Sequence, residues 1–532
     1  MRDNDDRKDD AIADGADPGH SPYIGDREEL GITDAAATGA EEDEQGYGDA
    51  VAAIAASGLL GDSDVIADVI AEPDATRELA DMTGLEERMA DIAAELAARA
   101  PEHDVQPSTQ RVVDCLDILG NPHTTYRTIH ITGTNGKTST SRMIAALLAE
   151  KGLRVGRYSS PHMHTMRERI SIDDRILSRQ EWIDVWEQVH PAVAMVDAAS
   201  ARSGGPPLST FELFTVMAYA AFADAPVDVA VIEVGMGGLW DATNVIDADV
   251  AVLTTIDIDH ARYLGTTRAE VASEKVGIIK DGSVVVSAVQ HEDVLPILAD
   301  AVSKHRARLL FEGRDILLED RTPGVGGQMI SVGTPAASYR EVPLNLLGHH
   351  QARNAVLAIA AVEAFFGGSA LDGTVIEHAL MSVQSPGRLE LVRSSPAVVA
   401  DGGHNPAGLA AAAAAMKETF HGPIVGVFAV MADKDVEAML GILEPFLDAV
   451  VVTSLSNPRA LPVEDARQIA EDVFGEERVR EEYDLLDAVD MAASLAESLN
   501  REEMTAPAVL AIGSIELAAR VRELFAKATR SP

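Results

Sequence analysis

The stretch YRTIHITGTNGKTSTSRMIAALLAEKG, residues 126–152, carries the strongest local signal in this chain. Its first eight residues, YRTIHITG, are predicted to form a strand. A short loop with two glycines follows, and SRMIAALLAEKG has the apolar spacing of a helix that ends at Gly152. A glycine-containing loop between a strand and a helix is the context in which proteins bind phosphate groups.

The loop itself, GTNGKTS, supplies each kind of group that such a site needs. Backbone N–H groups and the helix N-terminus favour a bound phosphate. Lys137 places a cation near the β- and γ-phosphates, and the hydroxyl of Thr138 or Ser139 is within reach of Mg²⁺. The generic phosphate-loop spacing is not met, because Ile131 stands where the first glycine would be. The sequence therefore predicts an ATP site formed by Gly133, Thr134, Asn135, Gly136, Lys137, Thr138 and Ser139.

Apolar strand-like segments alternate with helical segments on both sides of this loop. This alternation predicts an α/β fold with parallel sheets covered by helices. We expect a phosphate-loop ATPase domain at residues 83–378, with short β-like pieces near 310–345, and a smaller Rossmann-like domain at 379–532. Residues 1–82, rich in Asp, Glu, Ala and Gly, are predicted to be a mostly disordered acidic tail.

The composition narrows the class of function. The formal net charge of −43 argues against nucleic-acid binding as the main activity. A single cysteine, Cys115, fits a reducing cytoplasm, and no apolar run is long enough to span a bilayer. We expect a cytoplasmic monomer that acts on small molecules.

A carboxylate near the end of an apolar strand is the second strong signal. Glu233 lies in VDVAVIEVGMGG, where burial is costly unless the carboxylate is paired or binds a metal. Mg²⁺ prefers such oxygen ligands. The next apolar strand, VAVLTTIDIDH, ends in Asp259 and His260, beside the proposed metal.

Several motifs together carry a resemblance to a known family. TGTNGKTST resembles the loop of the Mur ligase superfamily, and SSPH…ER, SEKVGI and DGGHNP resemble motifs of the folylpolyglutamate synthase and dihydrofolate synthase family. The resemblance runs from about Leu85 to the C-terminus. GGLWDATN, residues 237–244, departs from the family pattern, which has arginine at 239 and leucine at 240.

The resemblance implies roles for further residues on the nucleotide side. It makes Ser160 and His260 Mg²⁺ ligands together with Glu233, and it places the family's often carbamylated lysine at Lys275. It also implies that Asn354 contacts adenine and that Arg388 and Asp401 contact the nucleotide. His404 is expected either to assist deprotonation of the incoming amine or to bind the glutamate carboxylate.

The resemblance also implies an acceptor site. Ser209, Thr210, Phe211 and Glu212 match a stretch that borders dihydropteroate, and Phe211 is suited to stack on a pterin. Asp241 and Asn244 match the family's DATN residues. Arg167 and Arg169 either hold a substrate carboxylate or are solvated loop charges.

The implied activity is ATP-dependent addition of L-glutamate to dihydropteroate, to (tetrahydro)folate polyglutamates, or to both, through an acyl phosphate. Two alternatives stay open. One is a Mur-type ligase that adds an amino acid to a peptidoglycan precursor, and the other is a phosphate-loop ATPase without ligase activity.

Overall fold

The computed structural model describes residues 73–101, 108–324, 326–501 and 505–528. The chain divides into two compact units, residues 1–82 and 83–532, and the second unit is described here. The predicted acidic tail lies outside the described residues up to residue 72. Within the described residues, no helix combines the length and the apolar character needed to cross a membrane.

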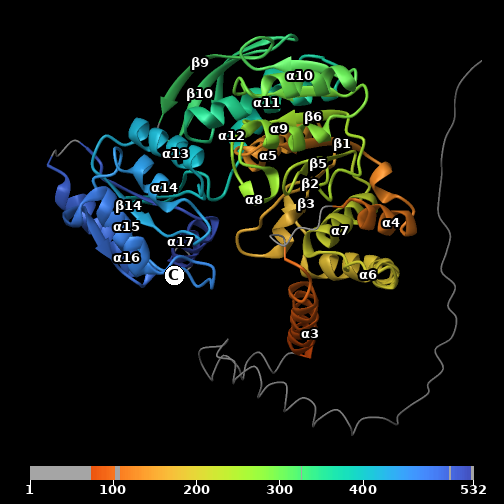
Figure 1. The fold of residues 1–532 in the computed structure, drawn as a ribbon, viewed down its shortest axis with the longest axis horizontal. Coiled ribbons are helices and arrows are strands. Elements are labelled where there is room, and N and C mark those ends of the chain that lie inside the picture. Colours follow the sequence, from red (N-terminus) through yellow and green to blue (C-terminus); the bar gives the residue numbers. More distant parts are fainter. Residues whose placement is uncertain (1–72, 102–107, 325, 502–504, 529–532) are drawn as a thin grey trace, which may run out of the picture. The chain divides into compact units, whose positions relative to one another are not determined.

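The phosphate loop belongs to an eight-stranded sheet with the order β4-β3-β2-β5-β1-β6-β7-β8 (Figure 1). Strands β2, β5, β1, β6, β7 and β8 are parallel, and β3 and β4 are antiparallel at one edge. The bounds are β1 (Arg127–Thr132), β2 (Val155–Tyr158), β3 (Ile170–Ile172), β4 (Arg175–Ile176), β5 (Val229–Glu233), β6 (Val250–Leu253), β7 (Val284–Ser287) and β8 (Arg308–Phe311).

Both faces of this sheet are covered, which is why strands such as β5 and β6 are almost wholly apolar. Successive side chains of a strand point to opposite faces. In β5, Val229 and Val231 join the core on one face, and Ala230 and Ile232 join the core on the other.

Helices form the outer layers (Figure 1). One face carries α5 (Lys137–Glu150), α11 (His349–Phe365) and α12 (Gly373–Ser382). The other face carries α4 (Gln110–Ile118), α6 (Arg179–Arg202), α7 (Thr210–Asp224), α9 (Arg268–Lys275) and α10 (Leu295–Lys304), with the short α8 (Ala261–Leu264) and the second half of α3 (Pro73–Ala97).

A small antiparallel sheet interrupts the alternation, where the sequence predicts short β-like pieces. It has the order β11-β10-β9, with β9 (Leu317–Gly324), β10 (Gly327–Gly333) and β11 (Ser338–Leu344). Gln328 of β10 donates through Nε2 to the carbonyls of Leu346 and Gly348 at 2.6 and 3.0 Å. This sheet therefore holds the turn from which α11 begins.

The C-terminal part is a second doubly wound sheet, with the order β12-β13-β17-β14-β15-β16. All neighbouring strands are parallel except the β12–β13 pair. The strands are β12 (Glu390–Ser394), β13 (Ala397–Ala400), β14 (Ile424–Phe428), β15 (Ala449–Val452), β16 (Val479–Glu481) and β17 (Ala508–Ile512). Helices α13 (Pro406–Thr419), α14 (Val436–Leu443) and α15 (Val463–Phe474) cover one face, and α16 (Leu485–Leu499) and α17 (Ile515–Ala528) cover the other.

The predicted α/β class is confirmed by this arrangement. The predicted boundary between residues 378 and 379 falls inside α12, so we propose a boundary after this helix. This helix packs on α5, and the first core extends to Val383.

Candidate active site

The phosphate loop joins β1 to α5, and its geometry depends on Gly136. This residue has φ of +89°, and a Cβ built on it would lie 2.7 Å from Oδ1 of Asn354. Only glycine meets both conditions without strain or collision. Asn354 on α11, which is predicted to contact adenine, therefore lies directly against this loop.

Two lysines converge on this loop. Lys137 Nζ donates to the carbonyls of Gly133 and Thr134 at 2.9 and 3.2 Å, and Lys275 Nζ donates to the same Gly133 carbonyl at 2.9 Å. Burial lowers the pKa of Lys275 to about 7, and the charge of Lys137 acts in the same direction. Lys275 is therefore a buried amine that exchanges its proton near neutral pH.

Glu233 closes the floor of the site at the end of β5. The residue is 1% exposed, and its Oε1 accepts a hydrogen bond of 2.9 Å from the Thr138 hydroxyl. Burial raises the pKa of Glu233, while Lys137 and Thr138 act against that rise. Its other oxygen, Oε2, is buried and has no hydrogen-bond partner among the residues that the structure describes. A buried carboxylate oxygen in this condition fits a cation.

His260 stands beyond the end of β6 in a strained backbone conformation, with φ of 50°. Such conformations cluster at functional sites. The side chain of His260 is 42% exposed. Desolvation by the surrounding groups lowers the pKa of His260, against the opposing charge of Asp259, and this favours a neutral imidazole that is able to bind a metal. Among the described residues, no three His, Cys, Asp or Glu side chains gather as a metal cluster. Mg²⁺ does not require one, since it is commonly held by one or two protein groups with phosphate oxygens and water.

The C-terminal domain contributes the opposite wall of the site. Asp401 is buried and accepts hydrogen bonds from the backbone of Leu389 and Gly403 at 2.9 and 2.7 Å. Burial raises the pKa of Asp401, and Arg388 opposes that rise. Arg388 Nη1 donates to the Gly387 carbonyl at 3.1 Å.

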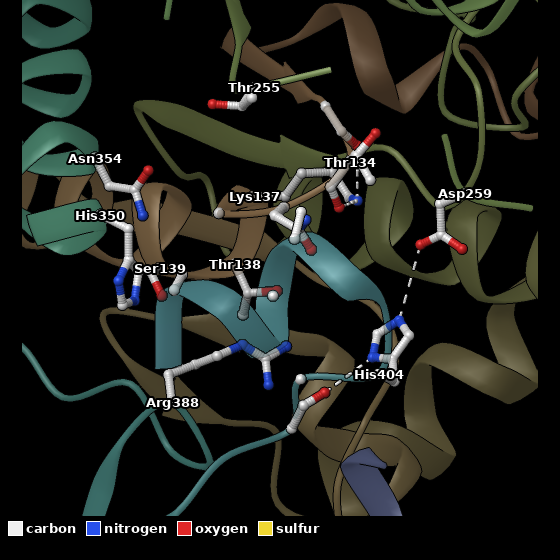
Figure 2. Close-up of a pocket in the computed structure, with 18 of the residues that line it drawn as sticks. Thr134, Lys137, Thr138, Ser139, Thr255, Asp259, His350, Asn354, Arg388 and His404 are labelled. Atoms are coloured by element: carbon white, nitrogen blue, oxygen red, sulfur yellow. Dashed lines mark hydrogen bonds and ion pairs between the residues drawn. The ribbon is translucent and has the colours of Figure 1, made fainter. Parts of the chain in front are cut away.

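His404 has a defined tautomer. Its Nδ1 lies 2.9 Å from the Gly402 carbonyl, which only accepts, so Nδ1 carries the proton. Burial lowers the pKa of His404, with Asp259 opposing, and the neutral ring then offers a lone pair at Nε2. That atom lies 3.9 Å from Asp259 Oδ2 (Figure 2).

These side chains line one cavity (Figure 2). It brings together all of the residues predicted to bind nucleotide or metal or to act in catalysis: Gly133, Thr134, Asn135, Gly136, Lys137, Thr138, Ser139, Ser160, Glu233, His260, Lys275, Asn354, Arg388, Asp401 and His404. Figure 2 places Asn354 and His350 at one end of the cavity and Asp259 and His404 at the other.

A second, larger cavity adjoins the first. It is lined by aromatic and basic side chains, among them Phe211, Phe214, Trp240, Arg169 and Arg459. Ser160, His260 and His404 line both cavities, as do Pro161, Gly235, Met236, Asp259, Ala407 and Ile515. The shared wall is the place where a group bound in one cavity can react with a group bound in the other.

The residues predicted to bind the acceptor make different polar contacts within the protein. Ser209 and Glu212 form a capping box at the start of α7, and Arg111 pairs with Glu212 at 2.8 Å. Asp241 accepts from the backbone of Met236 and Thr243. The Thr210 hydroxyl donates to the Leu96 carbonyl at 3.0 Å. The second cavity is lined by Ser209, Thr210, Phe211, Glu212 and Asp241.

Asn244 lies apart from both cavities. Its Nδ2 donates to the carbonyls of Leu239 and Gly277, at 3.1 Å each. Of the two arginines of the loop after β2, Arg169 lines the second cavity, where its Nε donates to His162 Nδ1 at 2.9 Å. Arg167 donates to the Leu177 carbonyl at 2.7 Å.

The sequence assigned no individual role to three residues at or next to the shared wall: Asp259, Asn405 and Lys434. Asp259 Oδ2 accepts from Asn405 Nδ2 at 3.1 Å, and Asp259 Oδ1 lies 3.7 Å from Lys434 Nζ. The available signal was position, because Asp259 and Asn405 each follow an apolar strand. Their partners lie far away in sequence, so their contacts were not visible there.

Comparison with known proteins places this site in a family. The Mur ligase middle domain matches residues 131–187 and 192–362, and the Mur ligase glutamate ligase domain matches residues 387–508. The dihydrofolate synthase/folylpolyglutamate synthase of Mycobacterium tuberculosis is 44% identical over 451 residues, which cover 81% of this chain and 93% of that protein. The chain belongs to the dihydrofolate synthase/folylpolyglutamate synthase family of Mur ligases.

Other members of the family agree in sequence and in structure. The Bacillus subtilis dihydrofolate synthase/folylpolyglutamate synthase is 34% identical over 373 residues, 69% of this chain and 85% of its own. M. tuberculosis folylpolyglutamate synthase complexed with ADP and AMPPCP matches with a TM-score of 0.79 and 42% identity, covering 84% of this chain and 100% of that one. E. coli FolC in complex with DHPP and ADP matches with a TM-score of 0.71 and 27% identity, covering 83% and 98%. The predicted family is confirmed.

Proposed function

We propose that this protein is an ATP-dependent ligase that joins L-glutamate to dihydropteroate and to folates through an acyl phosphate. The observation that carries the proposal is the shared wall of the two cavities. Ser160, His260 and His404 face both the phosphate-loop side and the aromatic side. Relatives named for both activities, and relatives bound to ADP or to DHPP, support the same choice.

The first step activates the acceptor carboxylate. One of its oxygens attacks the γ-phosphorus of ATP, the bond to the β-phosphate oxygen breaks, and ADP leaves. Lys137 leaves its loop carbonyls and turns to the phosphates, where its charge stabilises the developing negative charge. Arg388 adds a second cation from the C-terminal domain, so the nucleotide site is complete when both domains are present.

The residues present fit a bound Mg²⁺. Glu233 would hold it through the buried Oε2 that lacks a partner, with Ser160 and His260 as further ligands. Such an ion supplies charge neutralisation at the β- and γ-phosphate oxygens. The Thr138 hydroxyl, bonded to Glu233 Oε1, fixes the orientation of the carboxylate.

The second step forms the amide. The amine nitrogen of L-glutamate attacks the acyl carbon, and the bond to the phosphate oxygen breaks. His404 Nε2 accepts the proton that the amine loses, because Nδ1 is already protonated and bonded to Gly402. No nucleophilic side chain is needed. Enclosure between the two domains protects the acyl phosphate from water.

Lys275 is proposed to carry a carbamate. Addition of CO₂ requires a neutral amine, and the lowered pKa of Lys275, about 7, provides that form at neutral pH. The N–C bond forms as the amine loses a proton, and the product is an anionic oxygen ligand. Incubation with ¹³C-bicarbonate should give a carbamate carbon signal by NMR. That signal should be absent in Lys275→Arg, whose guanidinium does not form a carbamate, and its absence from the wild type would contradict the proposal.

Phosphate release tests the function directly. Purified protein is incubated with Mg-ATP and L-glutamate, alone, with 7,8-dihydropteroate, or with tetrahydrofolate. Stimulation by both pterins supports two activities, and stimulation by tetrahydrofolate alone restricts the enzyme to polyglutamate synthesis. Glu233→Gln, which keeps the shape of the side chain and removes its charge, should abolish the stimulation.

The two alternatives predict different results in the same assay. A peptidoglycan-precursor ligase would respond to neither pterin and would require a uridine-linked peptide as acceptor. A phosphate-loop ATPase without ligase activity would release phosphate at a rate independent of L-glutamate. The folate-family relatives favour the first proposal over both.

A further inference from the structure

The side-chain amide of Asn405 connects three parts of the molecule. It begins α13 in the C-terminal domain, where its Oδ1 accepts a hydrogen bond of 2.9 Å from the Gly408 backbone. The same oxygen accepts from Asn135 Nδ2 of the phosphate loop at 3.2 Å. Its Nδ2 donates to Asn135 Oδ1 and to Asp259 Oδ2, at 3.1 Å each.

All four hydrogen-bonding positions of this amide are therefore used. An asparagine offers two donors and two acceptor lone pairs, and each has a partner here. The orientation of the amide is also fixed, because a backbone N–H requires the oxygen and a carboxylate requires the NH₂ group. Asn405 is 6% exposed, so water does not replace any of these hydrogen bonds when it is lost.

We propose that Asn405 is a positioning residue that couples docking of the C-terminal domain to the phosphate loop. Capping α13 needs only the bond to Gly408. The remaining bonds reach residues 270 and 146 positions away, in the loop that would bind ATP and beside the proposed metal ligand His260. Lys434 of the same domain supports the contact from the other side of Asp259, at 3.7 Å.

The contact has a direct consequence for the reaction. Asn405 follows His404, which lines both cavities, so a shift of α13 moves the proposed base and releases the phosphate loop together. Nucleotide on the loop and glutamate at the C-terminal domain then favour the same docked arrangement. Such coupling is reciprocal, and each ligand strengthens the binding of the other. This inference rests on the proposed ligase function.

Two substitutions separate coupling from helix capping. Asn405→Ser and Asn405→Asp both retain a residue that caps helices well. Serine cannot reach Asn135 and Asp259 together, and aspartate places a carboxylate against Asp259. If Asn405 only capped α13, the wild type and both variants would have equal kcat/KM values for L-glutamate. Asp484→Ser is the matched control, because it exchanges the cap of α16 in the same domain, away from both cavities.

Because nucleotide favours the docked arrangement, we expect the Kd for AMPPCP to rise by about fivefold or more in both Asn405 variants and to stay unchanged in Asp484→Ser. The kcat/KM for L-glutamate should fall about tenfold in Asn405→Ser and further in Asn405→Asp. It should not change in Asp484→Ser. Equal kcat/KM values in wild type and both Asn405 variants would overturn the proposal, as would an equal loss in the Asp484 control.

A second measurement does not depend on turnover. In small-angle scattering with AMPPCP, we expect a larger radius of gyration for Asn405→Asp than for the wild type and the Asp484 control. The same radius in all three proteins would overturn the coupling. A wild type without glutamate-dependent turnover would instead contradict the proposed function, so the two failures are distinguishable.

Discussion

At the scale of single residues, Lys137 and Lys275 both contact the phosphate loop but differ in exposure and in hydrogen-bond partners. Lys137 is partly exposed and lines the first cavity, and its hydrogen bonds within the described residues go to carbonyls of its own loop, which suits the proposed exchange of those carbonyls for phosphate oxygens. Lys275 is 4% exposed and shares the Gly133 carbonyl. Lys137 is therefore the lysine that we propose to contact the phosphates of ATP, whereas burial holds the pKa of Lys275 at about 7.

Lys137→Ala should reduce pterin-stimulated phosphate release by about 100-fold or more, since one preorganised group that stabilises transition-state charge contributes about that much. The measurement is initial rate at saturating L-glutamate. Lys151→Ala is the control, because it removes the same charge at the far end of α5, outside both cavities. A comparable loss in both variants would point to a change in overall charge.

Lys275 should make folding stability depend on pH. Its pKa is about 7 when folded and near 10.5 when unfolded. Between these two pH values the unfolded chain binds more protons than the folded chain, so the free energy of unfolding rises with pH. Below about pH 7 the amine is charged in both states, and burial of that charge then lowers the stability of the folded state by the largest amount. Urea unfolding in CO₂-free buffer should show Lys275→Met more stable than the wild type at pH 6, with the gap narrowing toward pH 9. A gap that is constant over this range would mean that Lys275 does not titrate there.

At the scale of elements, the start of α7 combines a structural and a proposed substrate-binding role. Ser209 and Glu212 form a capping box, which explains their spacing without any ligand. Phe211 lies between them in sequence, and its ring packs so closely on Gly235 that a Cβ there would lie 2.3 Å from Cζ. The cap thus sets the position of an aromatic ring in the wall of the second cavity.

Ser209→Ala should lower the free energy of unfolding by about 1 kcal/mol, the usual cost of losing a helix cap. Ser178→Ala is a matched control, because Ser178 forms the same capping box with Glu181 at the start of α6, away from both cavities. Denaturant unfolding should give similar losses for the two variants. A rise in the KM for dihydropteroate that is confined to Ser209→Ala would support a direct substrate contact.

Phe211→Ala should raise the KM for dihydropteroate about tenfold, because ring stacking and lost apolar contact are each of the order of 1 kcal/mol. The comparison variant is Phe211→Tyr, which keeps the ring and should stay near the wild type. Steady-state kinetics with the pterin varied provides the measurement. An unchanged KM in Phe211→Ala would remove this ring from the acceptor site.

At the scale of the whole molecule, the site belongs to the second unit. Within the described part of the chain, no residue that lines either cavity precedes Leu96. Because the described lining residues all lie beyond this segment, removal of residues 1–72 should leave kcat/KM for L-glutamate within about twofold. A tenfold loss on truncation would assign the acidic segment a part in catalysis.

Much of this organisation follows from local sequence. The strand, loop and helix of residues 126–152 are evident from apolar spacing and glycine placement, and so are the parallel strands, because both faces of each are buried. Glu233 could be singled out because a carboxylate in an apolar strand needs a partner wherever it lies. The family resemblance added Arg388, Asp401 and His404, which have no distinctive local pattern.

The capping box of α7 is a feature whose side-chain contacts the sequence did not predict. Ser209, Thr210, Phe211 and Glu212 match the family stretch equally well in sequence, yet the structure gives most of their polar groups to helix capping and backbone contacts. Asn244 matches as well, and its amide joins two backbone carbonyls away from the cavities. Motif spacing does not reveal which way a side chain turns.

The sequence by itself determined the α/β class, the phosphate loop and the family, because each rests on motifs whose residues are close together in the chain. It also predicted the chemistry of the nucleotide side. Only the tertiary structure decided that Asn135, Asp259 and Asn405 meet, that two lysines share one carbonyl, and that two cavities share a wall. Those contacts join residues more than 100 positions apart. Their partners are selected by the packing of sheets and helices, which no local pattern records.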